Sequence, residues 1–161
     1  MGQPNGPAQP AGPTGRGVFP FNRSAREERM AATAVTAHIG STNYQVQFDD
    51  GTHTWLADEP ASLGGGDTGP APYSLLLSSL GACTSITLKM YAQRKEWPLD
   101  GVRVKLSMET GNAGTTIDRQ IVLEGALSDE QRERLLQIAN ACPVHKVLTN
   151  AITIRSGLVA A

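Results

Sequence analysis

The sequence predicts an α+β domain, and three observations support this class. Alternating apolar and polar residues, which are typical of strands, occur at Tyr44–Phe48 and Val102–Met108. The long apolar segment between them, Tyr73 to about Lys95, is typical of a buried helix. Further helical patterns and turn residues complete the order β-β-β-α-β-β-α-α-β, with antiparallel strands.

The amino-terminal part, residues 1–28, is predicted to be a disordered tail, followed by one folded domain over residues 29–161. Half of the first twenty residues are Gly or Pro, and Arg16 is the only charged residue among them. Such a segment cannot bury enough apolar surface to offset its conformational entropy. It has neither the apolar core of a secretory signal nor a transit-peptide pattern, and no run of about 18 apolar residues follows. We therefore expect a cytoplasmic protein without a membrane span.

The first three strands are predicted as a small antiparallel meander. Ala31–Ile39 alternates loosely, Tyr44–Phe48 alternates strictly, and Thr52–Leu56 is a short third strand. Asp50-Gly51 favours a tight hairpin because this pair tolerates positive φ. The loop that follows contains Gly64-Gly65-Gly66, but no Lys-Ser/Thr follows the glycines as in a phosphate-binding loop.

The central helix is predicted to begin next to Pro72, which is well placed at a helix start. Residues at spacings of three and four share one face, and the opposite side of the first half is also apolar or small. A helix that is apolar nearly all round is predicted to be buried. The residues of the shared face are Leu76, Leu80, Cys83, Thr87 and Met90.

The carboxy-terminal half is predicted to form a hairpin, two helices and a last strand. Val102–Met108 pairs with Thr116–Leu123 across a glycine-containing turn. Ser128 with Gln131 fits a capping box that opens a helix ending near Asn140. A short helix at 144–150 and a strand at 151–154 complete the domain.

The overall charge argues against a nucleic-acid partner. The net charge is −1 and aromatic residues make up 5% of the chain. A basic surface with interleaved aromatic side chains is therefore not predicted.

The chain has two cysteines, Cys83 inside the central helix and Cys142 at an expected helix start before Pro143. Two such thiols indicate either one redox couple or two inert core residues, since free cysteine also behaves as a small hydrophobe. In the cytosol a disulfide is more often transient and catalytic than structural. Open backbone N–H groups at the helix start, together with His145, would stabilise a thiolate at Cys142.

A metal site is not predicted, because the candidate ligands do not form two close pairs. Cys142 and His145 are one pair, and Cys83 would have to be joined by His38 or His53. A structural zinc site usually has two such pairs. No cofactor is indicated by any motif.

Three segments together resemble the OsmC/Ohr superfamily, and the resemblance spans residues 31–155. They are Gly69–Leu77, Leu80–Thr84 and Cys142–Lys146. Two further segments, Ala57–Pro60 and Met90–Ala92, are most similar to the OsmC-like branch of this superfamily. The resemblance implies an intertwined homodimer in which antiparallel sheets from both subunits are wrapped around two long central helices.

The resemblance also implies thiol-dependent reduction of organic hydroperoxides in oxidative-stress defence. By position, Cys83 would be the peroxidatic cysteine and Cys142 the resolving one. A dithiol, often lipoyl-linked in this family, would then reduce the disulfide.

The sequence departs from the better-characterised peroxidases of this family. Tyr73 stands where an activating glutamate is expected, and the hairpin at 38–48 contains no arginine. Glu59 or His53 would then support the thiols, with His145. The alternatives are a non-peroxidase member that binds a small apolar or thiol-bearing ligand, and a domain with purely structural cysteines. The predicted ligand pocket is lined by Leu76, Leu80 and Met90.

Overall fold

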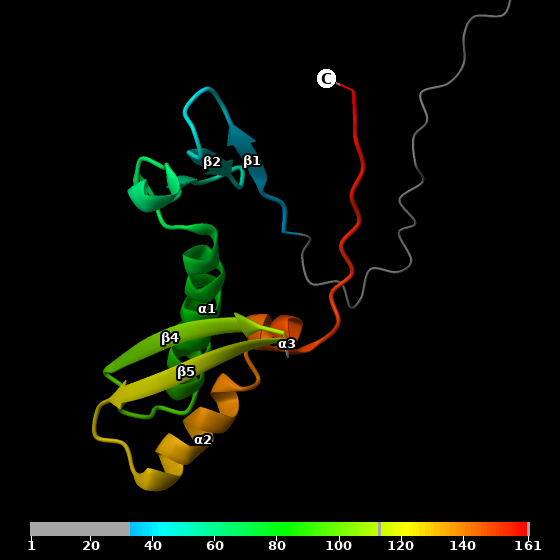
Figure 1. The fold of residues 1–161 in the computed structure, drawn as a ribbon. Helices are drawn as coiled ribbons and strands as arrows, with labels where there is room; N and C mark the ends of the chain where they lie inside the picture. The colour runs from blue at the N-terminus through cyan, green and yellow to red at the C-terminus, as the bar shows by residue number, and fades with distance from the viewer. Residues whose placement is uncertain (1–32, 113, 161) are drawn as a thin grey trace, which may run out of the picture. The chain divides into compact units, whose positions relative to one another are not determined.

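The computed structural model describes residues 33–112 and 114–160 of the 161-residue chain. The predicted tail, residues 1–28, lies outside the described residues. The described residues from Val35 onward form one compact unit. Its helices and antiparallel strands confirm the α+β class (Figure 1).

The first sheet contains the three predicted strands in the order β1-β2-β3, all antiparallel. The strands are β1 (Thr36–Ile39), β2 (Val46–Asp49) and β3 (Thr54–Ala57). Gly51 has φ 87° in the β2–β3 turn, which explains the glycine after Asp50. The short 3-10 helix η1 (Ala61–Leu63), which follows β3, was not predicted.

The loop between β3 and the central helix is organised by the buried carboxylate of Asp58. It accepts hydrogen bonds of 2.8–3.2 Å from the backbone N–H groups of Glu59, Gly66 and Thr68. The Thr68 hydroxyl donates a further bond of 2.8 Å, and this bond is the main reason that the pKa of Asp58 lies below its ordinary value of 3.8. A Cβ at Gly65 would clash with the carbonyl oxygen of Glu59. The N–H groups of Gly66 and Thr68 are thus bonded to an internal carboxylate instead of being free for a phosphate.

Asp58→Asn is expected to destabilise the protein at neutral pH and to weaken its sensitivity to acid. A carboxyl whose pKa is lowered by folding contributes stability above its unfolded pKa, and this stability is lost as the pH falls through the folded pKa. We expect a melting temperature lower by roughly 5 °C at neutral pH, with the difference from wild type closing in acid. Circular dichroism melts across the acid range measure this. Asp67→Asn, which changes an exposed carboxylate of the same loop, should melt like wild type, and equal melts for Asp58→Asn would contradict the assignment.

The central helix α1 (Pro72–Arg94) is 23 residues long and begins with Pro72 at its first position. The predicted bounds, Tyr73 to about Lys95, are confirmed to within one residue. Its buried side chains recur at every fourth position, so they form one stripe. They are Leu80, Thr84, Leu88 and Ala92.

The prediction that α1 is buried all round is wrong for a single chain. Ile86 and Met90, on the face opposite the buried stripe, are 58% and 54% exposed. The chain covers only the buried stripe, through contacts with β4 and the two later helices. By length and composition α1 would also suit a membrane span. A core helix of a soluble protein meets the same criteria, so this observation discriminates weakly.

The second sheet is a long hairpin of β4 (Gly101–Gly111) and β5 (Gly114–Glu124). Its register runs from Gly101 opposite Glu124 to Gly111 opposite Gly114. The hairpin crosses α1, as Figure 1 shows, and the side chains of Val102, Val104, Leu106 and Met108 are the less exposed ones of β4. A Cβ at Gly81 would lie 3.1 Å from Cδ1 of Leu106, so glycine permits this close crossing.

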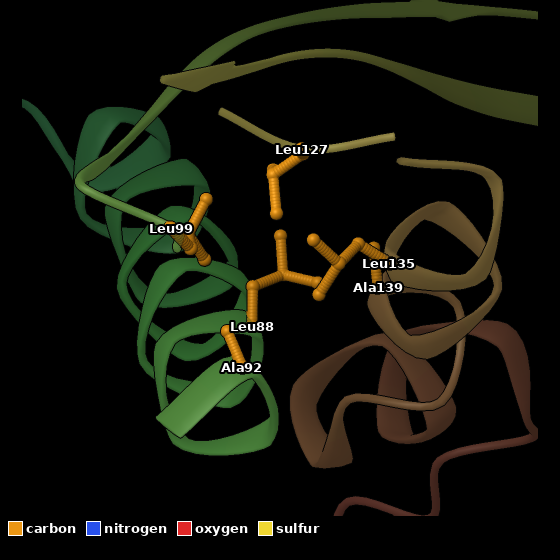
Figure 2. Packing of buried hydrophobic residues seen from close by; sticks show 6 residues of the cluster. All are labelled: Leu88, Ala92, Leu99, Leu127, Leu135 and Ala139. Atoms are coloured by element: carbon orange, nitrogen blue, oxygen red, sulfur yellow. The ribbon is translucent and has the colours of Figure 1, made fainter. Parts of the chain in front are cut away.

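The core lies between α1 and α2 (Asp129–Ala139) (Figure 2). The predicted capping box is confirmed, because Ser128 accepts from the Gln131 N–H and the Gln131 side chain accepts from the Ser128 N–H. Leu88 and Leu135 point toward each other in Figure 2, and both are fully buried. The full cluster is Leu88, Ala92, Leu99, Leu127, Leu135 and Ala139.

The last helix, α3 (Pro143–Thr149), is confirmed, whereas the predicted strand at 151–154 is wrong. Residues 151–160 have no regular structure, and Ile154 is 84% exposed. A strand needs an edge to pair with, and this segment pairs with no strand in the described part of the chain.

Candidate redox site

The two cysteines are positioned by α1 and α3, which contact each other. Cys83 lies in the middle of α1 and is half-buried, while Cys142 is fully buried. Both thiols are free. One thiol is therefore accessible from solvent and the other is enclosed by protein.

The sulfur of Cys142 sits at the start of α3, where the sequence predicted a helix cap. Cys142 is the N-cap residue, with Pro143 at the first helical position. Its Sγ accepts a hydrogen bond from the backbone N–H of His145 at 3.3 Å. The predicted N–H donor is confirmed, and it comes from the backbone of His145. A second neighbour is Oγ1 of Thr84, 3.8 Å from Sγ.

Arg119 of β5 reaches into this group of residues. Its Nη1 donates to Oγ1 of Thr84 at 3.0 Å and to the carbonyl oxygen of Ala139 at 3.2 Å. Its Nη2 donates to Oδ1 of Asn140 at 2.7 Å. Arg119 thus ties the hairpin to α1 and to the end of α2. All three acceptors are neutral, and no carboxylate forms an ion pair with Arg119 among the described residues.

Arg119 was not predicted as a site residue, although its position in β5 contains a signal. The less exposed positions of β5 alternate, and they are Ile117, Arg119, Ile121 and Leu123. A charged residue in the apolar register of a strand is unusual, because an unpaired buried charge is costly. Such a residue indicates a polar group on the facing element, which is Thr84 in this fold.

A cavity of about 390 Å³ lies beside this network. One part of its lining is apolar and another part carries the cation, an amide and an imidazole. The residues concerned are Leu80, Leu136 and Leu148, with Arg119, Asn140 and His145. This lining suits a small ligand with both apolar and polar groups.

The sequence of the chain matches the model of one protein family. Residues 64–156, more than half of the chain, match the family described as OsmC-like protein. The chain belongs to the OsmC-like protein family. The resemblance predicted from the sequence is therefore confirmed. No curated protein matches the chain.

Solved structures with the same fold include OsmC-like and organic hydroperoxide resistance proteins. The OsmC-like protein from Mycoplasma pneumoniae has a TM-score of 0.64 and 17% identity, covering 73% of this chain and 86% of that one. The organic hydroperoxide resistance protein OsmC from Legionella pneumophila has a TM-score of 0.56 and 21% identity, covering 76% of this chain and 92% of that one. OhrB of Bacillus subtilis, also an organic hydroperoxide resistance protein, has a TM-score of 0.54 and 24% identity, covering 73% of this chain and 90% of that one. At these identities the likeness establishes the fold.

The other predicted site residues of this OsmC-like chain lie in several places. Leu80 lines the cavity, whereas Leu76 and Met90 are exposed and are not among its lining residues. His53 is exposed in the β2–β3 hairpin, with Nδ1 3.4 Å from Oδ2 of Asp50. Glu59 is half-buried in the loop after β3. No hydrogen bond joins His53 or Glu59 to a cysteine within the described residues.

The described residues contain no group of three or more His, Cys, Asp or Glu side chains arranged to hold a metal ion.

Proposed function

We propose that the protein reduces organic hydroperoxides, with Cys83 and Cys142 as its peroxidatic and resolving cysteines. The observation that carries the proposal is the placement of two free thiols on contacting helices. The residue after Cys83, Thr84, touches the sulfur of Cys142. Family membership and the similarity to two organic hydroperoxide resistance proteins support the same reaction class.

In the first step, the Cys83 thiolate attacks the terminal peroxide oxygen. An S–O bond forms, the O–O bond breaks, and the alcohol leaves after taking up a proton. The sulfur is oxidised by two electrons to a sulfenic acid and the peroxide is reduced. The half-buried state of Cys83 supports this role, because a peroxide must reach the attacking sulfur from solvent.

In the second step, the Cys142 thiolate attacks the sulfur of Cys83. The S–S bond forms, the S–O bond breaks, and hydroxide leaves as water. A dithiol, such as a lipoyl group, then reduces the disulfide by thiol–disulfide exchange. The complete burial of Cys142 suits a resolving thiol, which needs to meet only the sulfenic acid. The proposed setting is the cytoplasm, where reducing systems restore thiols.

The proposal is tested by titrating the free thiols of the reduced protein before and after one equivalent of an organic hydroperoxide. The expected result is loss of both thiols within seconds, with a Cys83–Cys142 disulfide identified by mass spectrometry. Hydrogen peroxide is the matched control for substrate class. Two thiols that remain free after minutes would overturn the peroxidase proposal.

The same proposal includes a homodimer built on the second apolar face of α1. Leu76, Ile86 and Met90 share this face, and all three are exposed in one chain. Exposed apolar faces of this kind are typical of protein interfaces. The unpaired, apolar segment after α3 is a second candidate for contact between subunits.

A second candidate function is binding of a small ligand without peroxide turnover. The cavity beside Arg119 favours it, because leucine side chains and this cation line the same space. A thiol titration that fails, together with a ligand that protects Cys142 from slow alkylation, would support this alternative.

A further inference from the structure

We propose that Arg119 and Thr84 are positioning residues that hold the buried Cys142 in its thiolate form. The inference rests on the proposed function for its purpose, since a resolving cysteine attacks as a thiolate. It assigns to β5 a cation that the first hairpin of this chain lacks.

The hydrogen bonds of the Thr84 hydroxyl link Arg119 to the sulfur of Cys142. A guanidinium has no acceptor, so Arg119 Nη1 must donate to Oγ1 of Thr84 across 3.0 Å. The hydroxyl proton of Thr84 is then available for one further bond. Among the hydrogen bonds of the described residues, the other partner of Oγ1 is Sγ of Cys142 at 3.8 Å. In the proposed arrangement Thr84 accepts from the cation and donates to the sulfur, which is the direction that a thiolate requires.

The sulfur of Cys142 consequently faces two donors. One is the Thr84 hydroxyl, and the other is the backbone N–H of His145 at 3.3 Å. A neutral thiol would donate its proton to the second lone pair of Thr84 Oγ1 and would keep the His145 N–H as its one donor among the described residues. The thiolate accepts both bonds, so this arrangement stabilises the ionised form.

The positive charge of Arg119 also favours the thiolate form of Cys142. Arg119 is half-buried, and its bonds go to Thr84, Ala139 and Asn140, none of which is charged. A partly buried cation without a counter-charge is unfavourable. A thiolate at Cys142, one hydroxyl away, supplies the missing negative charge. The other titratable residues on the helices that meet at this sulfur include His145 on α3 and Cys83 on α1, next to Thr84.

The test follows the ultraviolet absorbance of the thiolate between about pH 5 and pH 9 in a Cys83→Ser background, where Cys142 is the remaining cysteine. The doubly substituted Cys83→Ser/Cys142→Ser protein supplies the baseline from tyrosine. Adding Thr84→Val, which removes the hydroxyl but keeps a similar volume, is expected to lower the thiolate signal at neutral pH about fivefold. Adding Thr84→Ser, which keeps the hydroxyl, should preserve the signal.

A matched pair of arginine variants isolates the cation. Arg119→Met should reproduce the loss seen with Thr84→Val, whereas Arg103→Met should titrate like the Cys83→Ser parent. Arg103 lies on the same hairpin but is exposed and pairs with Glu124 instead. Circular dichroism verifies the fold of each variant, and if Thr84→Val does not fold, Arg119→Met decides alone.

An unchanged titration in Thr84→Val, or in Arg119→Met where that variant decides, would overturn the inference. The measurement contains no peroxide, so its failure is distinct from failure of the proposed reaction. Wild-type protein that forms the disulfide on peroxide addition, with an unchanged titration in Thr84→Val, would keep the peroxidase and remove the role of Arg119.

Discussion

Cys83→Ser is expected to reduce the consumption of organic hydroperoxide by at least ~10³-fold, because the nucleophile of the first step is lost. The serine hydroxyl is not ionised at neutral pH and attacks the peroxide oxygen poorly. The fold should survive, since no side-chain hydrogen bond involves Cys83 within the described residues and its site is half-exposed. Peroxide remaining after incubation with enzyme and a dithiol gives the rate, and circular dichroism gives the fold.

Cys142→Ser is the matched control, because it removes a thiol without removing the proposed nucleophile. This variant should consume about one equivalent of peroxide and stop as the Cys83 sulfenic acid, which a dimedone adduct identifies. The opposite pattern would contradict the assignment. Peroxide consumption by Cys83→Ser with none by Cys142→Ser would make Cys142 the first nucleophile, as its helix-cap position alone suggests.

Local patterns predict most of the secondary structure, because the determining interactions lie close in sequence. Period-two alternation identifies both strands of the long hairpin, β4 and β5. The Ser128 and Gln131 side chains bond within one helical turn, so their capping box is readable from spacing alone. The same holds for Cys142 followed by Pro143, which correctly places a sulfur at a helix start.

Features that depend on contacts between distant segments cannot be predicted from local sequence patterns. The segment at 151–154 has strand-like residues, but its pairing partner would have to come from elsewhere in the assembly. Arg119 meets Thr84 only because β5 crosses α1, and the two residues are 35 positions apart in sequence. The proximity of Thr84 to Cys142, 58 positions later, has the same origin. The site therefore depends on tertiary packing even though each of its elements is locally encoded.

One apolar face of α1 is exposed in the single chain and would be covered in an assembly. The helix is apolar on two sides, and one side packs on the chain's own core while the other exposes Ile86 at 58%. Uniform apolarity predicts burial of both sides, and a second copy of the chain would complete it. The resemblance to the OsmC/Ohr superfamily implies the same arrangement.

Ile86→Asp is accordingly expected to dissociate the proposed homodimer. In a two-fold dimer each change occurs twice at the same interface, so two unpaired carboxylates would be desolvated together. We expect the dissociation constant to rise by at least ~100-fold, which corresponds to about 2.8 kcal/mol. Light scattering coupled to size-exclusion chromatography, over a range of protein concentrations, measures this.

Val122→Asp is a suitable control because the same substitution is made at an equally apolar and similarly exposed position. Val122 is 54% exposed on the outer face of β5, and the neighbouring residues on that face, Asp118, Gln120 and Glu124, are polar. A charge at this position should remain solvated and leave the dimer intact.

A wild-type protein that is monomeric at all concentrations would contradict the dimer. Equal dissociation in both variants would instead show that the effect does not come from the face of α1. Dissociation in Ile86→Asp alone would assign the second apolar side of the helix to the subunit interface.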